Sequence, residues 1–249
     1  MNEFLFIGIP YLAVAVCVIG TIVRFRCDRF SITSHSTQFI ENRWLFWGSN
    51  SWHWGILLIL AAHVAPMIAP GWWQSLLGEP TRLYILEVTG YGIAFLAAFG
   101  LGVLILRRLL SESLLALTSR ADWLLLVVLA FQVATGIWVA VAYRWGGAWY
   151  PDAAVPWLRS LVTLQPDIAA IAAMPWPVQL HAVSGFALLV LLPYTRLIHA
   201  ITYPVAYLWR PYQLVLWNRR AGRTHEPAPS ARQATAARPA ARAQLDERS

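Results

Sequence analysis

Four histidines lie inside long apolar segments, where a titratable ring is the residue best suited to chemistry. His53 and His63 share one segment, and His181 and His199 share another. Polar side chains at membrane depth are costly and are usually functional. The sequence contains no lysine and has few carboxylates near these rings. Four histidines paired by segment are therefore hard to explain as packing residues, and ligation of a metal explains them better.

The spacing of these histidines favours two separate sites over one. At about 1.5 Å rise per helical residue, His53 and His63 are roughly 15 Å apart, and His181 and His199 are roughly 27 Å apart. A four-coordinate zinc site needs clustered ligands, so zinc is a poor fit. Two sites that each take one ring from each helix match b-type haem, which needs two axial nitrogens in a flat apolar slot.

The composition predicts helices in a membrane that would position these rings. Of 249 residues, 58% are hydrophobic and 12% are charged, with a mean hydropathy of +0.53; soluble domains carry about a quarter charged residues. Roughly twenty apolar residues span a bilayer. The sequence thus predicts an all-α membrane protein whose five transmembrane helices form a di-haem bundle. These segments run approximately over Phe4–Val23, Leu45–Ile68, Leu83–Leu106, Trp123–Tyr143 and Val178–Ile201.

The arginines orient the predicted bundle. The net charge of +7 comes from arginine alone, and a soluble chain with this charge would suggest nucleic acid. Here the first and third connections and the C-terminal region hold most of the arginines, while the second and fourth connections hold Arg82, Arg144 and Arg159. The positive-inside rule then predicts an outer N-terminus and a cytoplasmic C-terminus, with no nucleic-acid partner.

This topology fixes how the histidines pair. The second and fifth segments cross the membrane in opposite directions, so His63 should face His181 near the outer surface. His53 should face His199 toward the cytoplasm. The unequal spacings require tilted helices or a bend, and Pro193 would supply a kink by removing one backbone hydrogen bond; a proline that the helix simply tolerates explains it equally well.

Two regions flank the predicted ligands on the cytoplasmic side. Arg196, one turn before His199, is suited to pair with a haem propionate, although snorkelling to the interface explains it equally well. Residues 1–217 are predicted to form the transmembrane cytochrome b domain. Residues 218–249 are rich in Ala, Arg and Pro without apolar periodicity and are predicted to be a disordered cytoplasmic tail.

At these histidines the sequence resembles a known family. The runs "SNSWHWGILLILAAHVAPM" and "QLHAVSGFALLVLLPYTRLIHAITYPVAYLWRPYQLV" are similar to the gamma subunit of respiratory nitrate reductase, the membrane cytochrome b of that complex. The N-terminal "IPYLAVAVCVIGTIVRFR" and the "GVLILRR" run also resemble it, so that the resemblance covers about residues 8–217. This chain departs from the family in its long tail, its extended fourth connection and its lack of lysine.

The resemblance implies a function for the predicted bundle. It implies two b haems held by His53, His63, His181 and His199, and oxidation of menaquinol or ubiquinol from the quinone pool near the outer face. It also implies a bacterial cytoplasmic (inner) membrane location, an iron–sulfur beta subunit as electron acceptor and a molybdenum-containing alpha subunit beyond it.

Glu87 and Arg82 are candidates for the quinol site, since both lie near the predicted outer end of the third segment. Glu87 would accept a quinol proton. Alternatively, the two residues form a loose interfacial ion pair.

Two other functions stay open from sequence. Alternatively, the chain would serve as the cytochrome b of another respiratory complex, of the sulfur-metabolism or hydrogenase type. In a different class, the histidines would relay protons in a transporter or channel, which a spectrum without b-type bands would favour.

Overall fold

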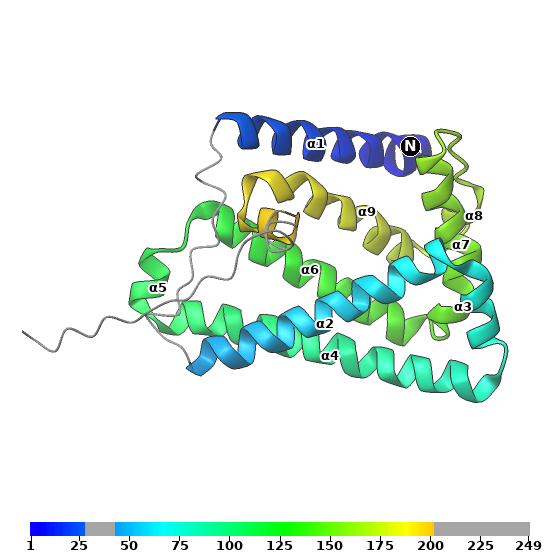
Figure 1. The fold of residues 1–249 in the computed structure, drawn as a ribbon, viewed down its shortest axis with the longest axis horizontal. Coiled ribbons are helices and arrows are strands. Elements are labelled where there is room, and N and C mark those ends of the chain that lie inside the picture. The colour runs from blue at the N-terminus through cyan, green and yellow to red at the C-terminus, as the bar shows by residue number, and fades with distance from the viewer. Residues whose placement is uncertain (28–42, 202–249) are drawn as a thin grey trace, which may run out of the picture. The chain divides into compact units, whose positions relative to one another are not determined.

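The structure is a computed structural model that describes residues 1–27 and 43–201. Within these residues it is helical and contains no strand. Five helical stretches of the described chain are long and apolar enough to cross a membrane: Phe4–Cys27, Trp44–Ile68, Pro80–Leu110, Arg120–Ala142 and Trp176–Tyr194. The prediction of an all-α protein with five such helices is confirmed (Figure 1). The predicted boundary at residue 217 and the tail 218–249 lie outside the described residues.

Five long helices carry these stretches, and shorter helices connect them. The long helices are α1 (Ile9–Cys27, after a π-helical turn at Phe4–Gly8), α2 (Arg43–Ile68), α4 (Pro80–Leu110), α6 (Arg120–Ala142) and α9 (Trp176–Leu191). The connecting helices are α3 (Pro70–Leu77), α5 (Glu112–Ala116), α7 (Gly146–Val162) and α8 (Ala169–Ala172). The predicted fourth connection is therefore largely helical.

The most extensive packing joins α2 and α4, which are antiparallel and diverge toward the end that carries α3 (Figure 1). A Cβ atom at Gly100 would lie 2.3 Å from the backbone nitrogen of Trp52, so no larger residue fits there. Small residues at such contacts let membrane helices gain van der Waals packing, which drives association where lipid removes the hydrophobic force. Helix α6 packs against both α4 and α9, and α9 packs against α1.

Helix α7 is anchored to the beginning of the chain. The side chain of Trp157 is 1% exposed, and its Nε1 donates a hydrogen bond to the Phe6 carbonyl at 2.8 Å. The Tyr11 hydroxyl donates to the Leu161 carbonyl at 3.0 Å. These bonds tie the connection between α6 and α9 to the first turns of the bundle.

The fifth span differs from its predicted extent. Helix α9 ends at Leu191, and the chain continues in two 3₁₀ turns, Leu192–Tyr194 and Arg196–Ile198, separated by an extended residue, Thr195. The predicted segment Val178–Ile201 is thus not one regular helix. The kink expected at Pro193 is present as a break in the helix.

Side chains replace the backbone hydrogen bonds that are lost at this break. The Thr195 hydroxyl donates to the Leu191 carbonyl at 2.8 Å, and its oxygen accepts from the Leu197 nitrogen at 3.3 Å. Nη1 of Arg24 on α1 donates to the carbonyls of Pro193 and Thr195 at 2.6 and 3.1 Å. Non-helical backbone at membrane depth is tolerated where such partners are present.

Candidate functional site

The structure brings the four histidines together in the two pairs that the sequence predicts. The ring centres of His63 and His181 are 6.5 Å apart, with 50° between the ring planes. The ring centres of His53 and His199 are 6.0 Å apart, with 62° between the planes. We call these the His63–His181 site and the His53–His199 site. Each takes one ring from α2 and one from the fifth span.

The ring separation matches a metal held between two imidazoles. A metal–imidazole bond is about 2.0 Å, and the centre of a five-membered ring with bonds near 1.33 Å lies about 1.1 Å from its nitrogen. Two rings bonded to one iron would thus have centres about 6 Å apart. Both pairs have close to this separation in the structure.

Three of the rings are oriented by carbonyls of their own segments. Nδ1 of His53 lies 2.7 Å from the Ser49 carbonyl, and Nδ1 of His63 lies 2.8 Å from the Ile59 carbonyl. Nδ1 of His199 lies 2.5 Å from the Arg196 carbonyl. A carbonyl can only accept, so each Nδ1 carries the hydrogen and each Nε2 keeps its lone pair. A histidine that ligates a metal is held in this way.

His181 is oriented differently, by side chains of α6. Its Nδ1 lies 3.1 Å from the Thr135 hydroxyl and 3.2 Å from Nε2 of Gln132. A Cβ atom at Gly136 would lie 2.9 Å from Cε1 of His181, so glycine lets the ring approach α6. Thr135, Gln132 and Gly136 were not predicted from the sequence. The signal that points to them is the polar spacing of "QVATG" within an apolar helix.

Helix α7 adds an aromatic residue to the His63–His181 site. The Tyr150 hydroxyl donates to the His63 carbonyl at 3.1 Å, and the two rings meet edge to face with centres 5.5 Å apart. Burial raises the pKa of Tyr150 to about 12, so this phenol keeps its hydrogen at physiological pH. Arg159, also on α7, donates to the Met67 carbonyl near the end of α2.

The predicted ion pair between Glu87 and Arg82 is not formed. The Glu87 carboxylate instead accepts from the Tyr91 hydroxyl at 2.6 Å, from Nε of Arg144 at 3.3 Å and from the backbone nitrogen of Trp145 at 2.7 Å. Arg82 pairs with Glu79 at 3.5 Å. Residues 82 and 87 are five positions apart and so lie about 140° apart around the helix, which explains why they do not meet.

The hydrogen bond that Arg144 donates to Glu87 also perturbs the Arg144 guanidinium. The Glu87 carboxylate raises the pKa of Arg144, which is exposed at the start of the connection between α6 and α7. Trp145 follows with a positive φ of 66°, a left-handed conformation that is uncommon for a non-glycine residue. Glu87 accepts from the Trp145 backbone nitrogen and thereby holds this turn against α4.

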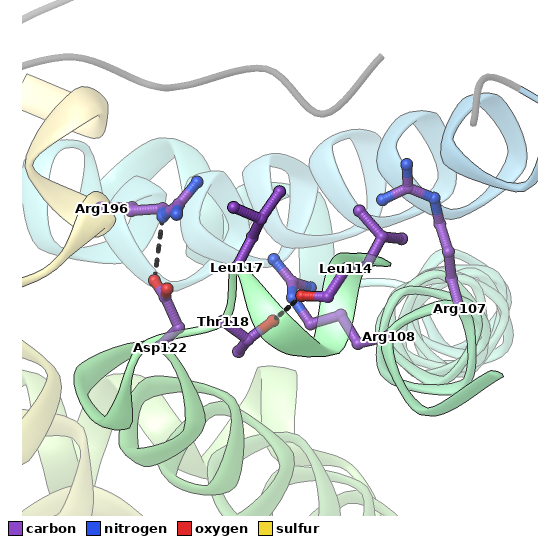
Figure 2. Close-up of a pocket in the computed structure, with 7 residues that line it drawn as sticks. All are labelled: Arg107, Arg108, Leu114, Leu117, Thr118, Asp122 and Arg196. Atoms are coloured by element: carbon purple, nitrogen blue, oxygen red, sulfur yellow. Dashed lines mark hydrogen bonds and ion pairs between the residues drawn. The ribbon is translucent and has the colours of Figure 1, made fainter. Parts of the chain in front are cut away.

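Arg196 lies near the other pair of histidines and faces a carboxylate. Its Nε donates to Oδ1 of Asp122 at 2.9 Å (Figure 2). Asp122 also caps the start of α6, where its side chain accepts from the backbone nitrogen of Ser119 at 3.0 Å. The cavity beside this pair is lined in part by Arg107 and Arg108 at the end of α4 (Figure 2). Positive charge therefore gathers near the His53–His199 site.

Comparisons with known proteins agree with one another. Residues 2–218 match the family model of the nitrate reductase gamma subunit. The chain is 30% identical over 215 residues to the nitrate reductase gamma chain of Bacillus subtilis (strain 168), covering 85% of this chain and 96% of that one. It is 32% identical over 222 residues to the respiratory nitrate reductase 1 gamma chain of Escherichia coli (strain K12), covering 86% and 97%. It is also 31% identical over 222 residues to the nitrate reductase-like protein NarX of Mycobacterium tuberculosis (strain ATCC 25618 / H37Rv), covering 85% of this chain and 33% of that protein.

Proposed function

The chain belongs to the nitrate reductase gamma subunit family, a membrane subunit of an oxidoreductase complex, and from this premise we propose that it oxidises quinol and passes the electrons through two b haems. His63 and His181 would be the axial ligands of the outer haem. His53 and His199 would be those of the inner haem. When bound, the haem groups would carry electrons one at a time from the outer to the cytoplasmic side.

The observation that carries this proposal is the geometry of the paired histidines. Both pairs have ring centres 6.0–6.5 Å apart. His53 and His63 are exposed on an apolar helix, and within the described residues no Nε2 of the four rings makes a hydrogen bond. An unsatisfied ring nitrogen in hydrocarbon is costly, and ligation of iron would remove that cost.

Charged residues support the orientation of the proposed pathway. Arg107, Arg108 and Arg196 lie near the His53–His199 site, which would face the cytoplasm by the positive-inside rule. Arg196, held by Asp122, would present positive charge to a propionate of the inner haem. The N-terminus would lie outside.

The quinol would bind beside the His63–His181 site. Oxidation of one menaquinol or ubiquinol to the quinone releases two electrons and two protons, and the protons would leave on the outer side. Tyr150, whose ring contacts His63, and α7 would shield this end of α2 from water. Arg82 remains a candidate for contact with the quinol. Glu87 binds three donors, which supports a role in holding the connection to α7 rather than in accepting a quinol proton.

The family assignment also supports a set of partners and a location. We expect an iron–sulfur beta subunit to accept electrons on the cytoplasmic side and to deliver them to a molybdenum-containing alpha subunit. The chain would lie in the bacterial inner membrane as a multi-pass subunit, in contact with lipid and the quinone pool. Purification of the native complex and identification of its subunits would test this. Subunits of a sulfur-metabolism or hydrogenase type would contradict the nitrate assignment.

Ligand substitutions test the haem proposal. In membranes containing the complex, His63→Ala and His181→Ala should each remove the same haem, and His53→Ala and His199→Ala should each remove the other. His35→Ala serves as a control outside the four-histidine set and should retain both. A reduced-minus-oxidised spectrum without b-type bands in the unaltered complex would refute the haem assignment and favour a histidine-relay transporter.

A further inference from the structure

His181 depends on a neighbouring helix for its orientation, unlike the other three paired histidines. Their Nδ1 atoms bond to carbonyls three or four residues earlier in their own segments. Nδ1 of His181 instead meets two side chains of α6, Thr135 and Gln132. A carbonyl can only accept a hydrogen bond, whereas a hydroxyl can donate or accept and an amide group has both a donor and an acceptor atom. The direction of each hydrogen bond to His181 therefore depends on the other partners of these side chains.

The Thr135 hydrogen and one of the two Gln132 amide hydrogens have acceptors other than Nδ1 of His181. The Thr135 hydroxyl has one hydrogen and lies 2.9 Å from the Phe131 carbonyl, to which it donates. Its oxygen therefore remains free to accept. Nε2 of Gln132 can only donate, and the His181 carbonyl lies 3.2 Å from it. The Gln132 side-chain oxygen accepts from the Ser184 hydroxyl at 2.6 Å, which fixes how the amide is turned.

Ligation of iron by Nε2 of His181 would place the ring hydrogen on Nδ1. Thr135 then accepts this hydrogen at 3.1 Å, because Nε2 of Gln132, the other polar atom near Nδ1, can only donate. Thr135 is 5% exposed, so water does not replace it as the acceptor. Gly136, one residue later, allows the ring to lie against this part of α6. The local structure thus provides Thr135 as an acceptor for a histidine that carries its hydrogen at Nδ1.

We propose that Thr135 is a positioning residue that accepts the Nδ1 hydrogen of His181, directs Nε2 to the iron and sets the reduction potential of the outer haem. This inference rests on the proposed haem site at His63 and His181. Gln132 and Ser184 would hold the backbone of His181 in register with Thr135.

The sign of the effect follows from the chemistry of the ligand. Accepting the Nδ1 hydrogen makes the imidazole more basic, which stabilises ferric over ferrous iron. Removal of the hydroxyl should therefore raise the potential of the outer haem. If loss of the partner weakens the preference for ferric iron about tenfold, the midpoint rises by about 59 mV for a one-electron couple.

A pair of variants isolates the hydroxyl. Thr135→Ser and Thr135→Ala both remove the methyl group and differ only in the hydroxyl. In the assembled complex, each haem would be titrated separately by optical redox potentiometry, with the haem content per chain measured in parallel. Thr163→Ala is the control, because Thr163 donates a similar bond to the Arg159 carbonyl at 3.1 Å on α7.

We expect the alanine variant to have a higher outer-haem potential than the serine variant, with the inner haem unchanged in both. Selective loss of the outer haem in the alanine variant alone would also support the proposal. Equal potentials in the two variants, or loss of haem from both, would overturn it, since the serine variant keeps the acceptor. An unaltered complex without b-type haem would instead refute the proposed function itself.

Discussion

Arg24 should control retention of the inner haem, although it lies on a helix that supplies no ligand. Its Nη1 donates to the carbonyls of Pro193 and Thr195, on either side of the break that leads to His199. A hydrogen bond to a charged group contributes about 1.5–3 kcal/mol. Replacing the guanidinium by an apolar chain in Arg24→Met leaves two carbonyls without this donor, so we expect this segment to lose about 3 kcal/mol.

A loss of about 3 kcal/mol corresponds to a roughly 100-fold larger dissociation constant for the inner haem. The Arg24→Met complex should therefore contain close to one haem per chain after purification. Separate redox titration of the haems should show that the haem of the His53–His199 site is the one that is missing. The haem content of the Arg24→Lys complex should lie between those of the Arg24→Met complex and the unaltered complex, because an ammonium lacks the planar fork of arginine. Amide hydrogen exchange of residues 192–198 should be faster in the methionine variant.

Arg26→Met is the matched control for this experiment. It removes a second arginine from the last turn of α1, and the Arg26 side chain is exposed. We expect it to keep both haems. If Arg24→Met also kept both haems with unchanged potentials and unchanged amide exchange of residues 192–198, the hydrogen bonds of Arg24 would not be what retains the inner haem.

Three further predictions concern the outer end of the bundle and the direction of electron flow. Glu87→Gln should lower the melting temperature by about 2–4 °C per kcal/mol of lost bonding and leave quinol turnover per haem unchanged; a large fall in turnover at full haem content would place Glu87 in proton transfer instead. Tyr150→Phe removes the bond to the His63 carbonyl and should alter the electron paramagnetic resonance signal of the outer haem alone, whereas an identical signal would show that α7 does not influence this site. The inner haem should have the higher reduction potential, because moving an electron inward costs about 2.3 kcal/mol per 100 mV of membrane potential; separate titration of the two haems checks this, and an outer haem well above the inner one would contradict it.

The sequence predicted those features of the fold and site that depend on hydrophobicity and on chain direction. Five apolar segments were sufficient to predict five helices. Two segments lie between the histidine-bearing helices, so these helices cross the membrane in opposite directions, and this was sufficient to pair His63 with His181. Neither inference needs the position of any neighbouring side chain. The structure therefore reproduces both, with paired rings 6.0 and 6.5 Å apart.

Side-chain contacts between different helices could not be predicted from the sequence. Thr135 reaches His181 because α6 happens to pack against α9, and residue spacing gives no information about that neighbour. The partner of Glu87 was predicted as the nearby Arg82, but the structure gives Arg144, which lies 57 positions along the chain. Charge attraction favours any opposite charge within reach, so only the packing of α4 against α6 and α7 decides between them.

The break after Leu191 explains how two helices with unequal histidine spacing share two sites. In a straight helix, eighteen residues from His181 to His199 would cover roughly 27 Å, whereas His53 and His63 are roughly 15 Å apart along α2. A continuous fifth helix would carry His199 well past His53. The two 3₁₀ turns and the extended Thr195 between them change the direction of the chain. The ring centre of His199 then lies 6.0 Å from the ring centre of His53. The spacing within α2 thus sets the separation of the two sites, and the fifth span adapts to it.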